Sequence, residues 1–330
     1  MIPIENSATP HYLERDMARP KISVLMSVYK EPLEWLHQSI DSILQQTFQE
    51  FEFIIVNDNP DRGDAISLLT DYAEKDARIK LLFNEVNIGL TKSLNKGLVV
   101  AKGKYIARMD ADDISLPERF EKQIAYMDEH LDVVVLGTMV KHFGKKSWWK
   151  PNEAKSFTDE DLKAQMLFGN CIAHPTAMIR KKILDENNIR YDEQYRHSQD
   201  YRLWEQLVPY GHFAKLKQAL LLYRVSDQQI TKKSSSSQSK LSQDISYRCQ
   251  NRWLDGEGMC YSIDDIKANP FRIINEIKQG NKFVKSKCFS ALVQFSYLNH
   301  PDAKSHITSF LKGDFRYMTF WNIIRYLLKL

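Results

Sequence analysis

Short apolar runs alternate with segments of helical spacing over the first third of this 330-residue chain. Runs that are nearly all apolar are typical of strands buried on both faces of a parallel sheet. The alternation therefore predicts an α/β fold with a Rossmann-like, mostly parallel sheet flanked by helices. The predicted strands are residues 21–28, 51–56, 79–83 and 105–109, and the predicted helices between them are 32–47, 65–76 and 91–101.

A cluster of three carboxylates, Asp110, Asp112 and Asp113, directly follows the fourth predicted strand. Because like charges at a strand's end repel one another, the cluster predicts a nearby cation. Mg²⁺ and Mn²⁺ are often held by one or two carboxylates, with water and substrate phosphates completing their ligands. The cluster therefore predicts a metal and diphosphate site, with an acidic helix start as the simpler alternative. Tyr29 and Asp58 also fall at the carboxyl ends of predicted strands, where α/β sheets bind ligands.

Composition excludes several classes of protein. A net charge of +4 is too small to indicate nucleic-acid binding, and we expect no nucleic-acid partner. The chain has no apolar run long enough to span a membrane, and its start lacks the pattern of a signal peptide. We therefore expect a cytoplasmic protein. Its four cysteines are scattered, which favours reduced thiols over disulfides or a zinc site.

The second half of the chain is less regular. It predicts strands at 133–140, 171–179 and 220–225, helices at 159–168 and 198–210, and a polar hinge at 234–237. We expect a leader at 1–20, an α/β domain at 21–232 and a helical C-terminal extension at 233–330. Aromatic and basic residues are interspersed at 309–330, which suits either a core helix or a helix on a membrane surface.

Several short segments, each weak alone, are informative in their order and spacing. They are Ser27-Val28-Tyr29-Lys30, residues 42–47, Val56-Asn57-Asp58, residues 87–90 and 103–107, Asp110-Ala111-Asp112-Asp113, residues 199–204, and Leu222-Tyr223-Arg224. In these segments the chain resembles, over about residues 21–231, the family 2 glycosyltransferases, which have the GT-A fold. The resemblance implies a nucleotide-sugar-binding first half, 21–115, and an acceptor-binding second half, 116–232.

The resemblance also implies roles for single residues in the nucleotide-sugar site. Asp110 would face the ribose and a metal ion, and Asp112 would coordinate the metal that bridges the two phosphates, with Ala111 between them. Tyr29 would stack on the base and Asp58 would accept the uracil N–H. The alternatives are a buried tyrosine and an aspartate that only forms a turn.

Three further residues have two interpretations each. Asp200 matches the acidic position of the family and is the predicted catalytic base, although a helix cap is the alternative. His174 is a possible metal, phosphate or acceptor contact, or a structural histidine. Lys92 either lies at the diphosphate or is a solvated helix residue. No third protein ligand of the metal is assigned.

The implied activity is an inverting, Mn²⁺- or Mg²⁺-dependent transfer of a hexose from a UDP-sugar, UDP-galactose or UDP-glucose. The implied acceptor is an undecaprenyl-diphosphate-linked saccharide of O-antigen, capsule or lipopolysaccharide synthesis, with peripheral contact to the inner face of the cytoplasmic membrane. One alternative is a sugar-1-phosphate nucleotidyltransferase, which needs a glycine-rich phosphate loop that residues 27–32 lack. Another is a non-catalytic sugar-nucleotide-binding partner of an assembly complex, which intact Asp110, Asp112 and Asp200 argue against.

Overall fold

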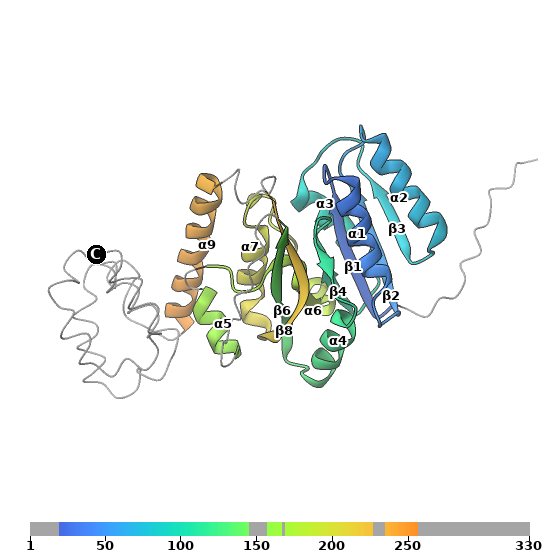
Figure 1. Cartoon of the computed structure of the whole chain (residues 1–330). Helices are drawn as coiled ribbons and strands as arrows, with labels where there is room; N and C mark the ends of the chain where they lie inside the picture. The colour runs from blue at the N-terminus through green and yellow to red at the C-terminus, as the bar shows by residue number, and fades with distance from the viewer. Residues whose placement is uncertain (1–19, 145–156, 167–168, 227–234, 257–330) are drawn as a thin grey trace, which may run out of the picture.

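The computed structural model of the protein describes residues 20–144, 157–166, 169–226 and 235–256. In these residues eight strands form one sheet in the order β3-β2-β1-β4-β7-β6-β8-β5. Figure 1 labels β1 to β4, β6 and β8. Parallel pairing joins β1 (Ile22–Val28), β2 (Phe51–Asn57), β3 (Ile79–Phe83) and β4 (Tyr105–Arg108). The helices between them are α1 (Leu33–Leu44), α2 (Gly63–Lys75) and α3 (Leu90–Val100). The alternation predicted from the sequence is confirmed.

The remaining strands make the sheet mixed. They are β5 (Ile114–Ser115), β6 (Val133–Gly144), β7 (Met178–Arg180) and β8 (His212–Val225). Short β7 runs antiparallel to both β4 and β6, whereas β8 runs parallel to β6 and antiparallel to β5. The other helices are α4 (Arg119–Glu129), α5 (Asp159–Met166), α6 (Lys181–Glu186), α7 (Gln199–Leu207) and α9 (Ser235–Gly256), with 3₁₀ turns η1 (His174–Thr176) and η2 (Val208–Tyr210).

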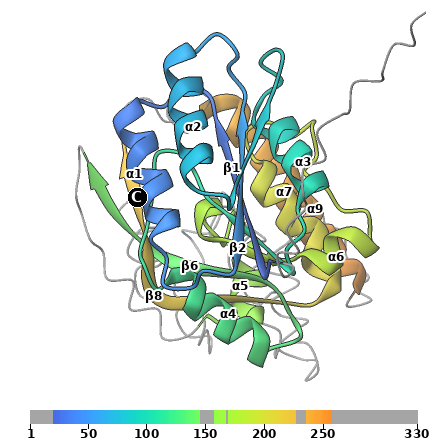
Figure 2. The ribbon, with the colours of Figure 1, turned by 90° about the vertical axis from the view of Figure 1, so that its right-hand side faces the viewer.

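Helices cover both faces of the sheet, as the layered view in Figure 2 shows. Because side chains alternate along a strand, Val24 and Met26 of β1 face one layer and Leu25 faces the other. The first layer is formed by α1, α2 and α4, and the second by α3, α5, α7 and α9. Burial on both faces explains why the parallel strands are nearly all apolar.

The structure differs from the sequence-based prediction in several details. Residues 171–179 were predicted as one strand, but His174–Thr176 form η1 and only Met178–Arg180 pair with the sheet. Pro175 has no N–H to donate to a neighbouring strand and suits the start of a tight turn. Strand β8 begins at His212, earlier than predicted, and Ser235 to Ser237 belong to α9 instead of a hinge.

Helix α9 packs against α7 (Figure 1). Its Ile245 and Cys249 are buried in the same cluster as Trp204 of α7. Residues 1–19 of the predicted leader and residues 257–330, including the predicted amphipathic tail 309–330, lie outside the described residues. The domain boundary after residue 232 stays a prediction. Among the described helices, none is both long and apolar enough to cross a membrane.

Candidate active site

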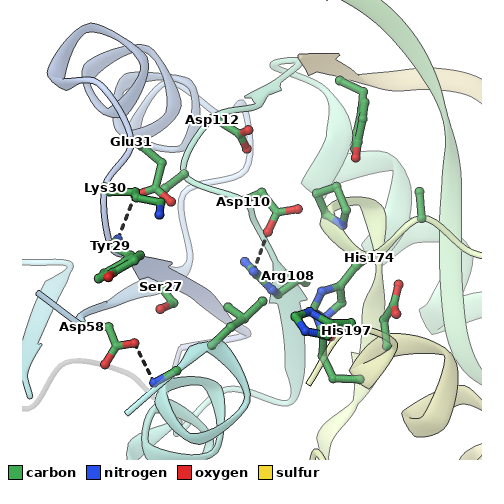
Figure 3. A pocket seen from close by; sticks show the side chains of 18 of the residues that line it. Ser27, Tyr29, Lys30, Glu31, Asp58, Arg108, Asp110, Asp112, His174 and His197 are labelled. Carbon is green, nitrogen blue, oxygen red and sulfur yellow. Dashed lines mark hydrogen bonds and ion pairs between the residues drawn. The ribbon is translucent and has the colours of Figure 1, made fainter. Parts of the chain in front are cut away.

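A pocket of about 710 Å³ opens at the carboxyl ends of β1, β2 and β4 (Figure 3). The ends of these strands and the segments after them supply Ser27, Tyr29, Lys30, Glu31, Asp58, Asp110, Ala111 and Asp112, and the second half of the chain supplies Asn170, His174, Arg196, His197, Gln199, Asp200 and Tyr223. All the candidate residues named from the sequence except Lys92 therefore line one cavity. Lys92 lies on the first turn of α3, where its ammonium pairs with Glu193 at 3.7 Å.

The acidic rim of the pocket contains Glu31 as well as Asp110 and Asp112. The Glu31 carboxylate accepts the Tyr29 N–H at 2.8 Å, and burial raises its pKa. Burial, together with the charges of Asp110 and Glu31, raises the pKa of Asp112 to about 7. The rim is thus repulsive in the metal-free protein, as the sequence predicted.

Buried arginines lie beneath this rim and hold the loop formed by residues 110–113. Arg108 is 1% exposed and pairs with Asp110 at 2.5 Å (Figure 3). Arg119, whose pKa burial lowers to about 9, donates to the Arg108 carbonyl at 2.7 Å. Arg224 donates its Nε–H to the Asp112 carbonyl at 2.6 Å and its backbone N–H to the Asp113 carboxylate at 2.8 Å. The protein itself therefore supplies part of the positive charge that the carboxylates require.

The acidic residues fit a divalent cation that takes most of its ligands from elsewhere. Among the described residues, no group of three or more His, Cys, Asp or Glu side chains is arranged to hold a metal. Two carboxylates are nevertheless a common protein contribution to a Mg²⁺ or Mn²⁺ site that substrate phosphates complete. Of the two carboxylates, that of Asp112 is the more available to a metal ion, because the Asp110 carboxylate already pairs with Arg108.

Asp58 and Tyr29 lie at the opposite end of the pocket from the second half of the chain. Asp58 is buried, and its Oδ1 accepts the Ile88 N–H and the Asn84 side-chain amide while its Oδ2 accepts the Gly89 N–H at 2.9 Å. Asp58 therefore stabilises the turn before α3, and its Oδ2 retains capacity for another donor. Tyr29 is 38% exposed, and the Lys30 ammonium lies over one face of its ring, 5.0 Å from the ring centre. The other face is the one on which a planar group would stack.

Asp200 faces the pocket from the first turn of α7. Its Oδ1 accepts the Tyr201 N–H at 2.8 Å and its Oδ2 accepts the Asn170 side-chain amide at 2.6 Å. Burial raises the pKa of Asp200 to about 6, although these two hydrogen bonds oppose the shift. A carboxylate that is ionised at neutral pH, with a pKa close to it, is suited to accept a proton from a substrate.

His174, in η1, lines the pocket on the side that the second half of the chain forms (Figure 3). Its Nε2 lies 2.8 Å from the Tyr191 hydroxyl, and burial lowers the pKa of His174 well below its usual value. The imidazole is therefore neutral and held in place by a tyrosine. The contact with Tyr191 fits the interpretation of His174 as a structural residue. Because His174 also lines the pocket, it can contact a bound molecule as well.

Sequence reasoning missed Glu31, Arg108, His197 and Gln199 as pocket residues. For Arg108 a signal was available, because a charged residue at the end of an otherwise apolar, buried strand needs a partner, and Asp110 follows two positions later. His197 and Gln199 are close to Asp200 in the sequence. That all three side chains line the pocket is known only from the structure, in which α7 begins at Gln199.

Comparison with known sequences identifies similar proteins. The family model described as Glycosyl transferase family 2 matches residues 23–187. An uncharacterized glycosyltransferase of Methanocaldococcus jannaschii is 37% identical over 212 residues, which are 64% of this chain and 72% of that protein. The O-antigen biosynthesis glycosyltransferase WbnJ of Escherichia coli is 34% identical over 214 residues, 64% of this chain and 82% of its own.

Two solved structures have a similar fold. Staphylococcus aureus TarS 1–349 in complex with UDP-GlcNAc matches 86% of this chain and 81% of its own, with a TM-score of 0.57 and 18% identity. Mannosyltransferase PcManGT from Pyrobaculum calidifontis, in complex with GDP-Man and Mn²⁺, matches 90% and 76%, with a TM-score of 0.53 and 13% identity. These likenesses confirm the predicted fold class.

Proposed function

This chain belongs to glycosyl transferase family 2 and is a glycosyltransferase, and we propose that it transfers a hexose from a UDP-sugar to a saccharide acceptor with inversion. The observation that carries the proposal is the meeting of two kinds of carboxylate in one pocket. Asp110 and Asp112 form an acidic rim, and Asp200, with a pKa of about 6, lies in the same cavity. The first suits a cation and diphosphate, and the second suits a proton acceptor.

The first half of the pocket supports binding of the UDP part of the donor. The exposed ring of Tyr29 is available to stack on a base, and Asp58 retains an acceptor site for the uracil N–H. UDP-galactose or UDP-glucose is our preferred donor, and the similarity to TarS, which was solved with UDP-GlcNAc, supports the choice of UDP. Asp110 and Asp112 would hold Mn²⁺ or Mg²⁺, which would neutralise the charge that develops on the departing diphosphate.

Asp200 supplies the acid–base chemistry in this proposal. An acceptor hydroxyl attacks the anomeric carbon on the face opposite the diphosphate. As the new glycosidic bond forms, the bond from that carbon to the diphosphate oxygen breaks, UDP leaves, and the hydroxyl proton passes to the Asp200 carboxylate. Asn170 and the Tyr201 N–H orient the carboxylate before the reaction. Arg108 keeps Asp110 in place from below the pocket.

The acceptor in this proposal is an undecaprenyl-diphosphate-linked saccharide of bacterial surface-polysaccharide synthesis at the inner face of the cytoplasmic membrane. The similarity to an O-antigen biosynthesis glycosyltransferase supports it. His174 is proposed as a wall residue that faces the acceptor, and Lys92 as a surface residue outside donor binding.

The experiment is a release assay for UDP. The protein is incubated with Mn²⁺ and with UDP-Gal, UDP-Glc, UDP-GlcNAc or UDP-GalNAc in turn, with GDP-Man as a comparison nucleotide. We expect one UDP-sugar to be hydrolysed, and EDTA to stop its hydrolysis. Exclusive use of GDP-Man, or equal rates in EDTA, would contradict the proposed donor or the proposed metal.

A further inference from the structure

Two polar atoms in the pocket wall beside Asp200 have no partner. Within the described ranges, Nδ1 of His197 and Oε1 of Gln199 are buried and make no hydrogen bond. Unpaired buried polar atoms are unfavourable, and most native proteins avoid them. Both side chains line the pocket, and both residues are partly exposed, so they lie within reach of a molecule bound there. A ligand that enters this part of the pocket would satisfy them.

The chemistry of these atoms selects the ligand. The amide oxygen of Gln199 accepts hydrogen bonds and needs a donor, whereas a diphosphate at neutral pH offers mainly acceptors. Nδ1 of His197 donates or accepts according to its tautomer. A sugar hydroxyl both donates and accepts, so it can pair with either atom. The pair therefore fits a saccharide better than the nucleotide diphosphate.

Helix α9 contributes to the same wall, although it follows the predicted end of the catalytic domain. Gln238, in its first turn, lines the pocket. The Ser242 hydroxyl lies 2.9 Å from the Ser198 hydroxyl, and Asp244 accepts the Tyr195 hydroxyl at 2.5 Å. These contacts hold the segment 195–198, which leads directly into Gln199 and Asp200.

We propose that α9 completes an acceptor-sugar subsite in which His197, Gln199 and Gln238 hydrogen-bond hydroxyls of the saccharide that receives the donor sugar. The proposal rests on the proposed function and assigns the acceptor side of that same pocket. Gln199 is adjacent to Asp200, so the subsite determines which acceptor hydroxyl reaches the base. The subsite would thus determine acceptor specificity, and its residues come from the start of α7, the segment before it, and α9.

The test compares the Michaelis constants of acceptor and donor. The donor is the UDP-sugar that the wild-type protein hydrolyses, and the acceptors are lipid diphosphates that carry GlcNAc, GalNAc, Glc or Gal. The variants are Gln199→Met and Gln238→Met. Matched controls are Gln206→Met on α7, which does not line the pocket, and Gln243→Met on the exposed face of α9.

We expect each pocket variant to raise the acceptor KM about 3- to 10-fold, the effect of one lost neutral hydrogen bond. The donor KM, measured by hydrolysis without acceptor, should stay within about twofold, since the lost contacts are absent from the donor complex. Both controls should match the wild type in both constants.

Three results would overturn the proposal. The first is hydrolysis of a UDP-sugar that no saccharide in the panel accelerates. The second is an equal rise of donor and acceptor KM in the pocket variants, and the third is an unchanged acceptor KM. Absence of any UDP-sugar hydrolysis by the wild type would instead overturn the proposed function, and this proposal with it.

Discussion

Replacing Asp112 by asparagine is expected to stabilise the metal-free protein at neutral and alkaline pH. Its pKa is raised from 3.8 to about 7 by burial and by the charges of Asp110 and Glu31. Between these two values the unfolded chain has lost a proton that the folded protein still holds, so stability falls as pH rises through this window. The Asp112 charge therefore opposes folding, most strongly above pH 7.

The magnitude follows from the shift. One pKa unit corresponds to about 1.4 kcal/mol, so a shift of about three units costs up to about 4 kcal/mol at pH 8. Near pH 4.5 the same calculation gives a cost of only about 1 kcal/mol to the free energy of unfolding. At that pH the carboxyl is protonated in the folded protein and ionised only in the unfolded chain. We expect Asp112→Asn to raise the free energy of unfolding at pH 8, and to raise it much less at pH 4.5.

Asp110→Asn is the matched control with the opposite sign. It removes the partner of Arg108, a guanidinium that is 1% exposed and already has an unpaired Nε among the described residues. Leaving that charge without its carboxylate should cost about 1 to 3 kcal/mol.

Chemical unfolding in EDTA at pH 8 and pH 4.5 measures both variants, and a repeat with Mn²⁺ should stabilise only the wild type. If Asp112→Asn destabilises the protein at pH 8 as Asp110→Asn does, the argument from repulsion is wrong.

Three further predictions concern the base, the fold and the tail. Asp200→Asn should lower kcat about 10²- to 10⁴-fold with UDP-sugar affinity retained, and wild-type kcat should fall as pH drops below about 6, where Asp200 becomes protonated; lost donor affinity with unchanged kcat would refute this. Gly103→Ala should destabilise the protein by about 1 to 3 kcal/mol in urea, because its Cβ would lie 2.4 Å from the Ser23 nitrogen, whereas Gly63→Ala, with open space around it, should not. Truncation before Ser309 should release the protein from anionic vesicles at low salt without loss of UDP-sugar hydrolysis; an unfolded product would show that the tail belongs to the core.

The sequence predicted the parallel half of the fold because burial on both faces leaves a direct pattern. Because α/β sheets bind ligands at the carboxyl ends of their strands, Tyr29, Asp58 and Asp110 were expected at one edge of the sheet. The pocket lies at that edge. Gly103 belongs to residues 103–107, one of the segments that carry the family resemblance, and sterics explain why a glycine is needed there. Its N–H donates to the Ser23 hydroxyl at 2.8 Å, and a side chain at this position would clash with β1.

The partners of the acidic loop were not predictable in the same way. Arg224 binds the Asp112 carbonyl across 112 positions of sequence, and no local pattern specifies such a contact. The start of the short antiparallel strand β7 was predicted too early, at residue 171 instead of Met178, because three paired residues after Pro175 are too few to show a period. The raised pKa of Asp200 depends on burial in the folded chain and, to a smaller extent, on the charge of Asp110, which lies 90 positions earlier in the sequence.

Helix α9 has a practical consequence for how the protein can be divided. Ile245 is fully buried and Cys249 nearly so, in a cluster that includes Leu203 and Trp204 of α7. A recombinant fragment ended at residue 232, the boundary that the sequence suggested, would expose that apolar face of α7 to water. Such a fragment should aggregate or be degraded by proteases. Expression of the catalytic unit should therefore extend at least through Gly256.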